Sequence, residues 1–259
     1  MSIHPSAAIS DKAQIGSNTA IGPFAIIEDD VVIGDGCKID GAAQIRNGSR
    51  IGNNCHIGSG ALISADPHFI GFDTSISSGV IMGDNNDIRE YVTLHRSIEA
   101  NQSTQIGSDN FLMNGAHVGH DCLLGDGNTL ANNVLLGGHV TMGDHCFFGG
   151  GAVVHQFVRV GNYVMAQGLS GVSLDIPHYV IISGINTIGG INAIGLKRAS
   201  LSVEARKGIK EAFRSIYRGN DTLAECLEQA ENASNPSEVE AFYDFFRKKS
   251  KKGVCVRFG

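Results

Sequence analysis

The sequence predicts an all-β fold, a parallel β-helix, followed by a C-terminal α-helical domain. Two observations predict it. Aliphatic residues recur every six residues through most of the chain, and the period becomes helical near residue 200. No helix has a six-residue period, and repeats of fixed length indicate stacked structural units. We therefore expect a repeat domain over residues 1–195 and a helical domain over residues 196–259.

The first run of repeats has isoleucine at every sixth position from Ile9 to Ile63. A second run keeps the same spacing from Ile106 to Val160. Glycine follows the isoleucine in five units of the first run, which suits tight corners because glycine adopts positive φ. Each unit is a short strand plus a corner. Three units then make one triangular coil, with coils stacked ~4.8 Å apart.

Two stretches depart from the repeat and are expected to leave the coil as loops. The first excursion lies at about residues 64–81, where the spacing from Ile63 to Met82 exceeds a full coil by one residue. The second lies at about residues 97–105 and carries no repeat signal, although the spacing from Leu94 to Ile106 holds. Such excursions in repeat proteins either shape binding sites or are plain surface bulges, and both interpretations stay open here.

The repeat ends near Pro177, and three helices are expected beyond Ser200. The first has an apolar stripe and ends at Gly219-Asn220; the stripe comprises Val203, Ile209, Ala212, Phe213, Ile216 and Tyr217. Thr222 and Glu225 predict a capping box for the second. The segment Asn235-Pro236-Ser237-Glu238 predicts a cap, with proline at the first helical position, for the third.

Composition excludes several functional classes. The net charge of −6 argues against binding to nucleic acid through phosphate contacts. Apolar runs are too short to span a bilayer, and the N-terminal residues do not resemble a signal peptide, so a cytoplasmic protein is expected. Residues 196–259 hold 13 Lys and Arg against 9 Asp and Glu, which suits either an acidic partner or a solvated helix face.

The cysteines are predicted to be structural. Four of them occupy the fifth place of a repeat unit, where small buried residues belong: Cys37, Cys55, Cys122 and Cys146. The chain has no C-x-x-C pair, so the cysteines predict neither a zinc site nor a disulfide framework.

Histidines gather along one edge once the chain is coiled. A step of one coil leads from His120 to Gly138, and a second step leads on to Gln156. The edge then holds His117, His120, Gly138, His139, His155 and Gln156. Polar surface residues without a role, or a metal site with Asp121, would also explain this column. A substrate groove with a general base explains it best, because histidine titrates near neutral pH. His4, His56, His68, His145 and His178 are expected at the surface or in loops.

The column suggests a chemistry. Asp121 could orient an imidazole and stabilise its charged form, but a direct contact with His120 requires a corner there, because neighbours on a strand point to opposite faces. Gly138 leaves a backbone N–H unobstructed as an oxyanion donor. No serine or cysteine stands beside the column as a nucleophile, so direct transfer to a substrate hydroxyl is expected.

The repeats together with "AHVGHDC", "LANNVLLGGHV", "GGGAVVHQFVRVG" and "GLKR" resemble the UDP-N-acetylglucosamine acyltransferases, which open lipid A synthesis. The resemblance covers nearly the whole chain. It implies a left-handed β-helix, a homotrimer with sites between subunits, an acyl carrier protein thioester as donor, and no cofactor or metal. It also implies roles: His120 as the base, Asp121 as its supporting carboxylate and Gly138 as the oxyanion donor. Substrate contacts would come from His117, His139, His155, Gln156, Asn192 and Arg198.

Two segments depart from that family. Its first loop usually reads Pro-Gln-Asp-Leu-Lys-Tyr, whereas "PHFIGF" places Phe69 and Gly71 at the Asp and Lys positions. Its Asn-x-Glu-Gly-Leu-Lys-Arg-Arg segment reads "NAIGLKRAS", with Ile194 and Ala199 replacing Glu and the second Arg. We expect transfer of a (3-hydroxy)acyl chain to the 3-hydroxyl of UDP-N-acetylglucosamine. A paralogue that acylates another amino sugar or nucleotide sugar, and a β-helical binding protein without turnover, remain alternatives.

Overall fold

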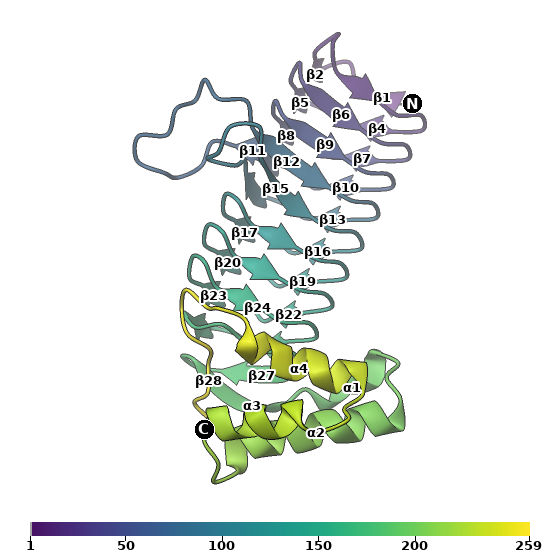
Figure 1. Cartoon of the computed structure of the whole chain (residues 1–259). Helices are drawn as coiled ribbons and strands as arrows, with labels where there is room; N and C mark the ends of the chain where they lie inside the picture. The colour runs from purple at the N-terminus through teal and green to yellow at the C-terminus, as the bar shows by residue number, and fades with distance from the viewer. Residues whose placement is uncertain (1) are drawn as a thin grey trace.

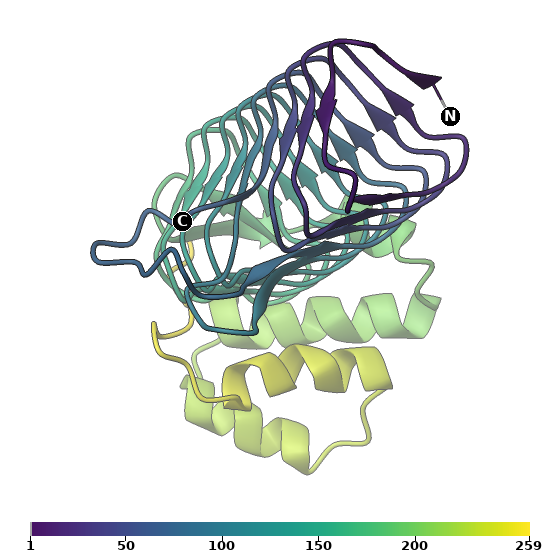
Figure 2. The same ribbon diagram turned by 90° about the horizontal axis from the view of Figure 1, so that it is seen from above.

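The computed structural model describes residues 2–259. Three sheets of short strands, parallel except for the last pair of the first sheet, form the faces of a triangular β-helix, seen from the side in Figure 1 and from above in Figure 2. None of the helices within residues 2–259 is long and apolar enough to cross a membrane.

The strands fall into three sheets that the chain visits in turn. Sheet A contains β1 (Ser2–Ile3), β4 (Ala20–Ile21), β7 (Lys38–Ile39), β10 (His56–Ile57), β13 (Asp87–Ile88), β16 (Phe111–Leu112), β19 (Thr129–Leu130), β22 (Phe147–Phe148), β25 (Met165–Ala166), β27 (Val180–Ser183) and β28 (Thr187–Ile191). Sheet B contains β2 (Ala8–Ile9), β5 (Ile26–Ile27), β8 (Gln44–Ile45), β11 (Leu62–Ala65), β14 (Thr93–His95), β17 (His117–Val118), β20 (Leu135–Leu136), β23 (Val153–Val154) and β26 (Gly171–Val172). Sheet C contains β3 (Gln14–Ile15), β6 (Val31–Ile33), β9 (Ser49–Ile51), β12 (Gly79–Met82), β15 (Ser103–Ile106), β18 (Leu123–Leu124), β21 (Thr141–Met142) and β24 (Arg159–Val160).

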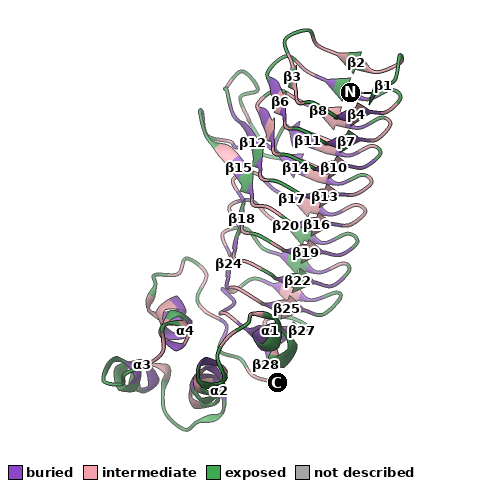
Figure 3. Cartoon of the chain, turned by 90° about the vertical axis from the view of Figure 1, so that its right-hand side faces the viewer, coloured by how far each residue is buried: buried purple, intermediate pink, exposed green. Residues whose placement is uncertain are grey.

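The repeated aliphatic side chains form the core of the β-helix. Ile27, Ile45 and Ile63 stack on successive coils and are at most 2% exposed. The six cysteines are free and buried, as the repeat predicts for four of them. Figure 3 shows the result: the corners of the coils are largely exposed, whereas the strands bury their inward residues. The core is therefore a continuous apolar rod enclosed by the three sheets.

Both excursions leave from the same edge of the triangle, which we name the B–C edge because it joins sheet B to sheet C. Ile45 pairs with Ile63 on the next coil, and the chain between them makes one regular coil. Ile63 pairs with Leu94, which is further along the chain, so the first excursion lengthens the coil between these two residues. Thr93 pairs with His117, which shows that the second excursion lengthens the next coil by a smaller amount. The first excursion projects from the coils in Figures 1 and 2.

Arg96 joins the roots of the two excursions. Its guanidinium forms an ion pair of 2.8 Å with Asp66 and donates hydrogen bonds to the carbonyls of Thr74 and Ile76. It also lies 4.8 Å from the centroid of the Phe72 ring. Because Arg96 belongs to the second excursion and its partners to the first, the two loops are packed together at this edge.

Four helices follow at the C-terminal end of the β-helix: α1 (Ala193–Arg198), α2 (Val203–Arg218), α3 (Leu223–Glu231) and α4 (Ser237–Arg247). Helix α3 packs on α2 and α4, away from the coils. The capping box of Thr222 and Glu225 is confirmed, and α2 ends before Gly219 as expected. Helix α1 was not predicted. Val203 was wrongly placed in the apolar stripe, since it is 74% exposed at the first turn of α2.

The predicted cap of the last helix is also wrong. Pro236 is itself the N-cap, Ser237 is the first helical residue, and no side chain caps the helix. Proline satisfies this position because it has no N–H to pair, while its carbonyl accepts from Val239.

The helical part is tied to the β-helix by Asp175, which is fully buried. Its carboxylate accepts from the backbone N–H and the Nε of Arg159, each at 2.7 Å. The Arg159 guanidinium lies 4.7 Å from the centroid of the Phe245 ring in α4. The Asp175 carbonyl accepts from Cys255 near the C-terminus. One buried ion pair thus joins coil, helix and C-terminal segment.

Candidate active site

The strand registers bring the predicted residues into one column on the B–C edge. His117 pairs with Leu135, and Leu135 with Val153, so each coil places the following corner directly above the one before. The corner positions 120, 138 and 156 therefore stack on three successive coils. The next corner residue of each coil has positive φ, at +58° for Asp121, +59° for His139 and +68° for Phe157. This turn places the side chains of His120 and Asp121 on the same side of the chain.

His120 and Asp121 form a hydrogen-bonded pair. His120 Nδ1 lies 2.8 Å from Asp121 Oδ2, and both side chains are largely buried. Asp121 also accepts hydrogen bonds from the Ser97 hydroxyl and from the Ile98 N–H. Burial alone would raise the pKa of Asp121, but these hydrogen bonds outweigh it and hold the pKa below its usual value. The carboxylate is therefore ionised and stabilises a positive charge on His120.

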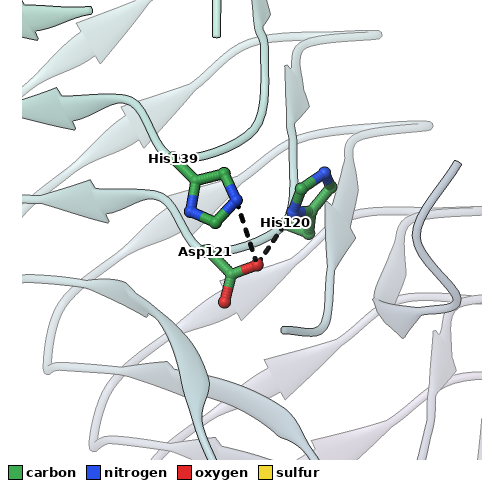
Figure 4. Close-up of side chains that lie close together, drawn as sticks. All are labelled: His120, Asp121 and His139. Atoms are coloured by element: carbon green, nitrogen blue, oxygen red, sulfur yellow. Dashed lines mark hydrogen bonds and ion pairs between the residues drawn. The ribbon is translucent and has the colours of Figure 1, made fainter. Parts of the chain in front are cut away.

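His139 completes the arrangement drawn in Figure 4. Its Nε2 lies 3.9 Å from Asp121 Oδ2, and its ring meets that of His120 edge-on with 5.0 Å between centroids. Its other face stacks on Phe157 at 4.6 Å. Burial lowers the pKa of His139 and outweighs the opposing charge of Asp121, so a neutral ring at neutral pH is expected.

These three side chains offer atoms within 4.8 Å of one another, a spacing that a metal ion could use. Both oxygens of Asp121 already accept hydrogen bonds, from Ser97, Ile98 and His120, and this favours an acid–base pair instead.

Gly138 lies directly against the His120 ring. A Cβ built on Gly138 would come within 2.6 Å of His120 Nε2 and 2.5 Å of its Cε1. Within residues 2–259 the Gly138 N–H donates no hydrogen bond. The free N–H and the unbonded Nε2 therefore border the same space, which suits a reaction in which a proton leaves one atom while negative charge develops beside it.

A second group of imidazoles adjoins this pair. The His95 ring meets His117 edge-on at 4.7 Å and His68 at 4.4 Å, while His68 stacks parallel to His117 at 6.0 Å. His117 Nδ1 lies 2.7 Å from Thr93 Oγ1. Burial, and then the neighbouring imidazoles, lower the pKa of His117 and bring that of His95 to about 3. Both rings are therefore neutral donors or acceptors at neutral pH.

His95 and His68 were missed by sequence reasoning. The predicted column omits His95, and His68 is predicted to be a scattered surface or loop residue. The repeat pattern is sufficient to place His95 near His117. Leu94 is in phase with the second run of repeats and pairs with Val118, and His95 follows Leu94 directly. For His68 no repeat signal exists, because the first excursion alone carries it to His117.

The first excursion also brings Phe69 to the pair. The Phe69 ring meets His120 edge-on at 6.2 Å and is 51% exposed. Lys251 Nζ from the C-terminal segment lies 4.7 Å from the centroid of the Phe157 ring, which stacks on His139. The repeat pattern predicts neither the Phe69 ring at the pair nor the Lys251 ammonium group beside Phe157.

The remaining predicted residues divide between two places. His155 and Gln156 lie on the next coil of the column, exposed, with His155 Nδ1 3.2 Å from the Gln156 carbonyl oxygen. Asn192 and Arg198 line a separate pocket of about 460 Å³ with His145 and Tyr163, at the edge that joins sheet C to sheet A. Within one chain the structure therefore does not bring Asn192 and Arg198 to the His120 pair.

Asn192 has a structural task as well. It is the N-cap of α1, where its Oδ1 accepts from the Gly195 N–H at 2.8 Å. Its Nδ2 donates to the Tyr163 carbonyl at 2.8 Å. The side chain thus fixes α1 to the coil and holds Arg198 at the pocket.

Comparisons with known proteins point to one family. Residues 175–255 match the model for the second domain of UDP-N-acetylglucosamine O-acyltransferase, and residues 12–41, 30–65 and 103–138 match bacterial transferase hexapeptide repeats. The chain is 36% identical over 188 residues to an acyl-[acyl-carrier-protein]–UDP-N-acetylglucosamine O-acyltransferase of Gloeothece citriformis, covering 72% of this chain and 68% of the relative.

Solved structures are similar over almost the full length. A UDP-N-acetylglucosamine acyltransferase from Bacteroides fragilis is 40% identical with a TM-score of 0.90, covering 97% of this chain and 98% of its own. That of Francisella novicida is 34% identical with a TM-score of 0.92, covering 99% and 94%. The expected left-handed β-helix with a C-terminal helical part is thereby confirmed. The chain belongs to the UDP-N-acetylglucosamine acyltransferase family.

Proposed function

We propose that this protein transfers a 3-hydroxyacyl chain from acyl carrier protein to the 3-hydroxyl of UDP-N-acetylglucosamine, the first step of lipid A biosynthesis, in the cytoplasm. One observation carries the proposal. Asp121 Oδ2 is hydrogen-bonded to His120 Nδ1 at 2.8 Å, which leaves the other ring nitrogen, Nε2, free beside the Gly138 backbone. The family and its named relatives support the donor and acceptor.

In the first step, His120 Nε2 removes the proton of the sugar hydroxyl while its oxygen attacks the thioester carbonyl. The imidazolium that forms is stabilised by Asp121, whose ionised carboxylate accepts from Nδ1–H. The carbonyl oxygen becomes an oxyanion, and the Gly138 N–H is positioned as its donor.

In the second step, the tetrahedral intermediate collapses and the carbon–sulfur bond breaks. The leaving thiolate takes the proton from His120 Nε2, which restores the neutral base. The product is an ester of the sugar, and the carrier protein leaves with a free thiol. No residue becomes acylated in this scheme: the serine nearest to the pair, Ser97, donates its hydroxyl proton to Asp121 and not to the base.

The other predicted residues bind substrate in this proposal. His117 and His139 are neutral hydrogen-bonding groups beside the base, and His155 and Gln156 extend the groove along the coils. Asn192 and Arg198 contact the nucleotide from a second subunit of a homotrimer, because within one chain they line a different edge.

The acceptor is the part of the proposal with a specific alternative. Phe69 and Gly71 stand where the family loop carries Asp and Lys, and the Phe69 ring is half-exposed against His120. Loss of a loop ammonium group removes charge-assisted hydrogen bonds worth ~1.5–3 kcal/mol each. A paralogue that acylates another amino sugar or nucleotide sugar is therefore the second candidate.

The test is to incubate the purified protein with a 3-hydroxyacyl carrier protein and each acceptor in turn, and to follow the acylated sugar by mass. We expect ester formation on UDP-N-acetylglucosamine. Product only on a nucleotide sugar with a different amino substituent would favour the second candidate. No product on any acceptor from the folded protein would contradict acyl transfer and favour a binding role.

A further inference from the structure

Ser97 touches the acid–base pair from the second excursion. Its side chain is fully buried, and its hydroxyl donates a hydrogen bond to Asp121 Oδ1. The neighbouring Ile98 N–H donates to the other carboxylate oxygen, Oδ2, at 3.2 Å. His120 Nδ1 contacts that same Oδ2. The root of this loop therefore holds both oxygens of the carboxylate that faces His120.

The Ser97 hydroxyl is itself held in place. The Glu99 N–H donates to Ser97 Oγ at 2.9 Å. The hydroxyl proton has two acceptors, the Glu99 carbonyl at 3.2 Å and the Asp121 carboxylate, of which the carboxylate is the closer. The Ser97 carbonyl accepts from Ser78 Oγ at 2.7 Å, a contact with the end of the first excursion. Ser97 also follows Arg96, which joins the two loops. These hydrogen bonds fix the position of Ser97 at the root of the loop.

We propose that Ser97 is a positioning residue for the reaction: it sets the rotation of the Asp121 carboxylate so that Oδ2 meets His120 Nδ1. The inference rests on the proposed function, and it assigns to Ser97 no contact with substrate. Because the hydroxyl donates to Oδ1, the carboxylate cannot turn without losing that bond as well as the Ile98 bond.

The same hydrogen bond affects the pH dependence. Two titratable groups face Asp121: His120 on its own corner and His139 on the next coil, whose own pKa responds to the charges of Lys251 and Glu99. Burial favours the protonated carboxyl, whereas the Ser97 hydrogen bond opposes it. Removing that hydroxyl therefore raises the pKa of Asp121, and the acid limb of the activity profile moves to higher pH.

The experiment compares Ser97→Ala with the wild type in the acyl transfer assay. We expect kcat to fall about tenfold, the loss produced by one hydrogen bond to a charged group. The KM for the acceptor should stay within about twofold, since Ser97 bonds to the carboxylate and not to the base, and the acid limb should move to higher pH. Ser97→Thr, which keeps a hydroxyl, should restore part of kcat.

Ser49→Ala is the matched control. Ser49 is also fully buried and hydrogen-bonded, to the Arg46 carbonyl and to Ser64, but it does not touch the acid–base pair. Both alanine variants lose a buried hydroxyl and should lose similar thermal stability. Only Ser97→Ala should change kcat and the pH profile. Equal losses of kcat in the two variants, or an unchanged kcat in Ser97→Ala, would overturn the proposal.

A measurement that needs no enzymatic turnover tests the role of Ser97 independently of the proposed function. Nitrogen-15 NMR of labelled histidine reports the His120 Nδ1–H bonded to Asp121. We expect its downfield proton signal in the wild type and in Ser49→Ala, and its loss or upfield shift in Ser97→Ala. A folded wild type that forms no product would contradict the function, while this signal would still decide the role of Ser97. An identical signal in Ser97→Ala and the wild type would refute it.

Discussion

Replacing the carboxylate of Asp121 by the amide in Asp121→Asn is the most informative change to the acid–base pair. The side chain keeps its shape but loses its charge. In the native site the two carboxylate oxygens accept from Ser97, Ile98 and His120. An amide has only one accepting oxygen, so one of these donors would face an NH₂ group. The His120 imidazolium would then form without a counter-charge.

The size of the effect follows from the geometry. His120 Nδ1 and Asp121 Oδ2 are 2.8 Å apart, and their side chains are only 15% and 12% exposed. Unit charges about 4 Å apart attract each other by about 4 kcal/mol at an effective dielectric constant of about 20. The amide dipole recovers part of this, so about 3 kcal/mol of transition-state stabilisation is lost, on the order of a hundredfold in kcat.

The assay is the initial rate of acylated sugar formation under saturating donor and acceptor. Asp35→Asn serves as the control, because Asp35 accepts from the Ser17 N–H at a corner far from the site, and Asn53 makes the same contact one coil on. We expect this control to keep its rate. A fall of less than about threefold in Asp121→Asn, with the fold intact, would refute the role assigned to the carboxylate.

Three further predictions concern neighbouring features. Gly138→Ala should lower kcat by about a hundredfold at intact stability, because its Cβ would displace the His120 ring, and steady-state kinetics with a melting curve checks this. The pKa of buried His95, about 3, lies below its unfolded value of about 6.5, so the unfolded chain binds the extra proton between these values and stability falls as pH drops through that window. From pH 7 to pH 5 the wild type should lose about 2 kcal/mol more than His95→Gln in denaturant titrations, and parallel curves would contradict this. Asp175→Ala should cost about 3 kcal/mol because it leaves the Arg159 guanidinium unpaired, and an unchanged melting temperature would disprove that account.

The repeat made most of the fold and half of the site predictable. A six-residue period determines which residues lie above one another, so His120, Gly138 and Gln156 could be aligned by counting alone. The corner at Asp121 was stated as a requirement for contact with His120, and the structure supplies it through a positive φ of 58°.

The other residues of the site are brought there by tertiary contacts that follow no sequence repeat. His68 and Phe69 reach the site because the first excursion folds back over the coils, and Arg96 fixes that loop through hydrogen bonds to its carbonyls. Such packing is tertiary and leaves no local pattern. Asn192 could be assigned a role only by resemblance, and its place at a different edge was not visible in the sequence.

The most direct test of the account is the rate of acyl transfer by His120→Ala compared with the wild type and with His4→Ala. His4 is an exposed histidine whose ring hydrogen-bonds to Ser6 in the first coil, so it controls for loss of an imidazole. The account predicts that His4→Ala keeps the wild-type rate and that His120→Ala, folded and with unchanged melting temperature, loses activity by at least about a thousandfold. A His120→Ala protein that still acylates UDP-N-acetylglucosamine within about tenfold of the wild-type rate would contradict His120 as the base.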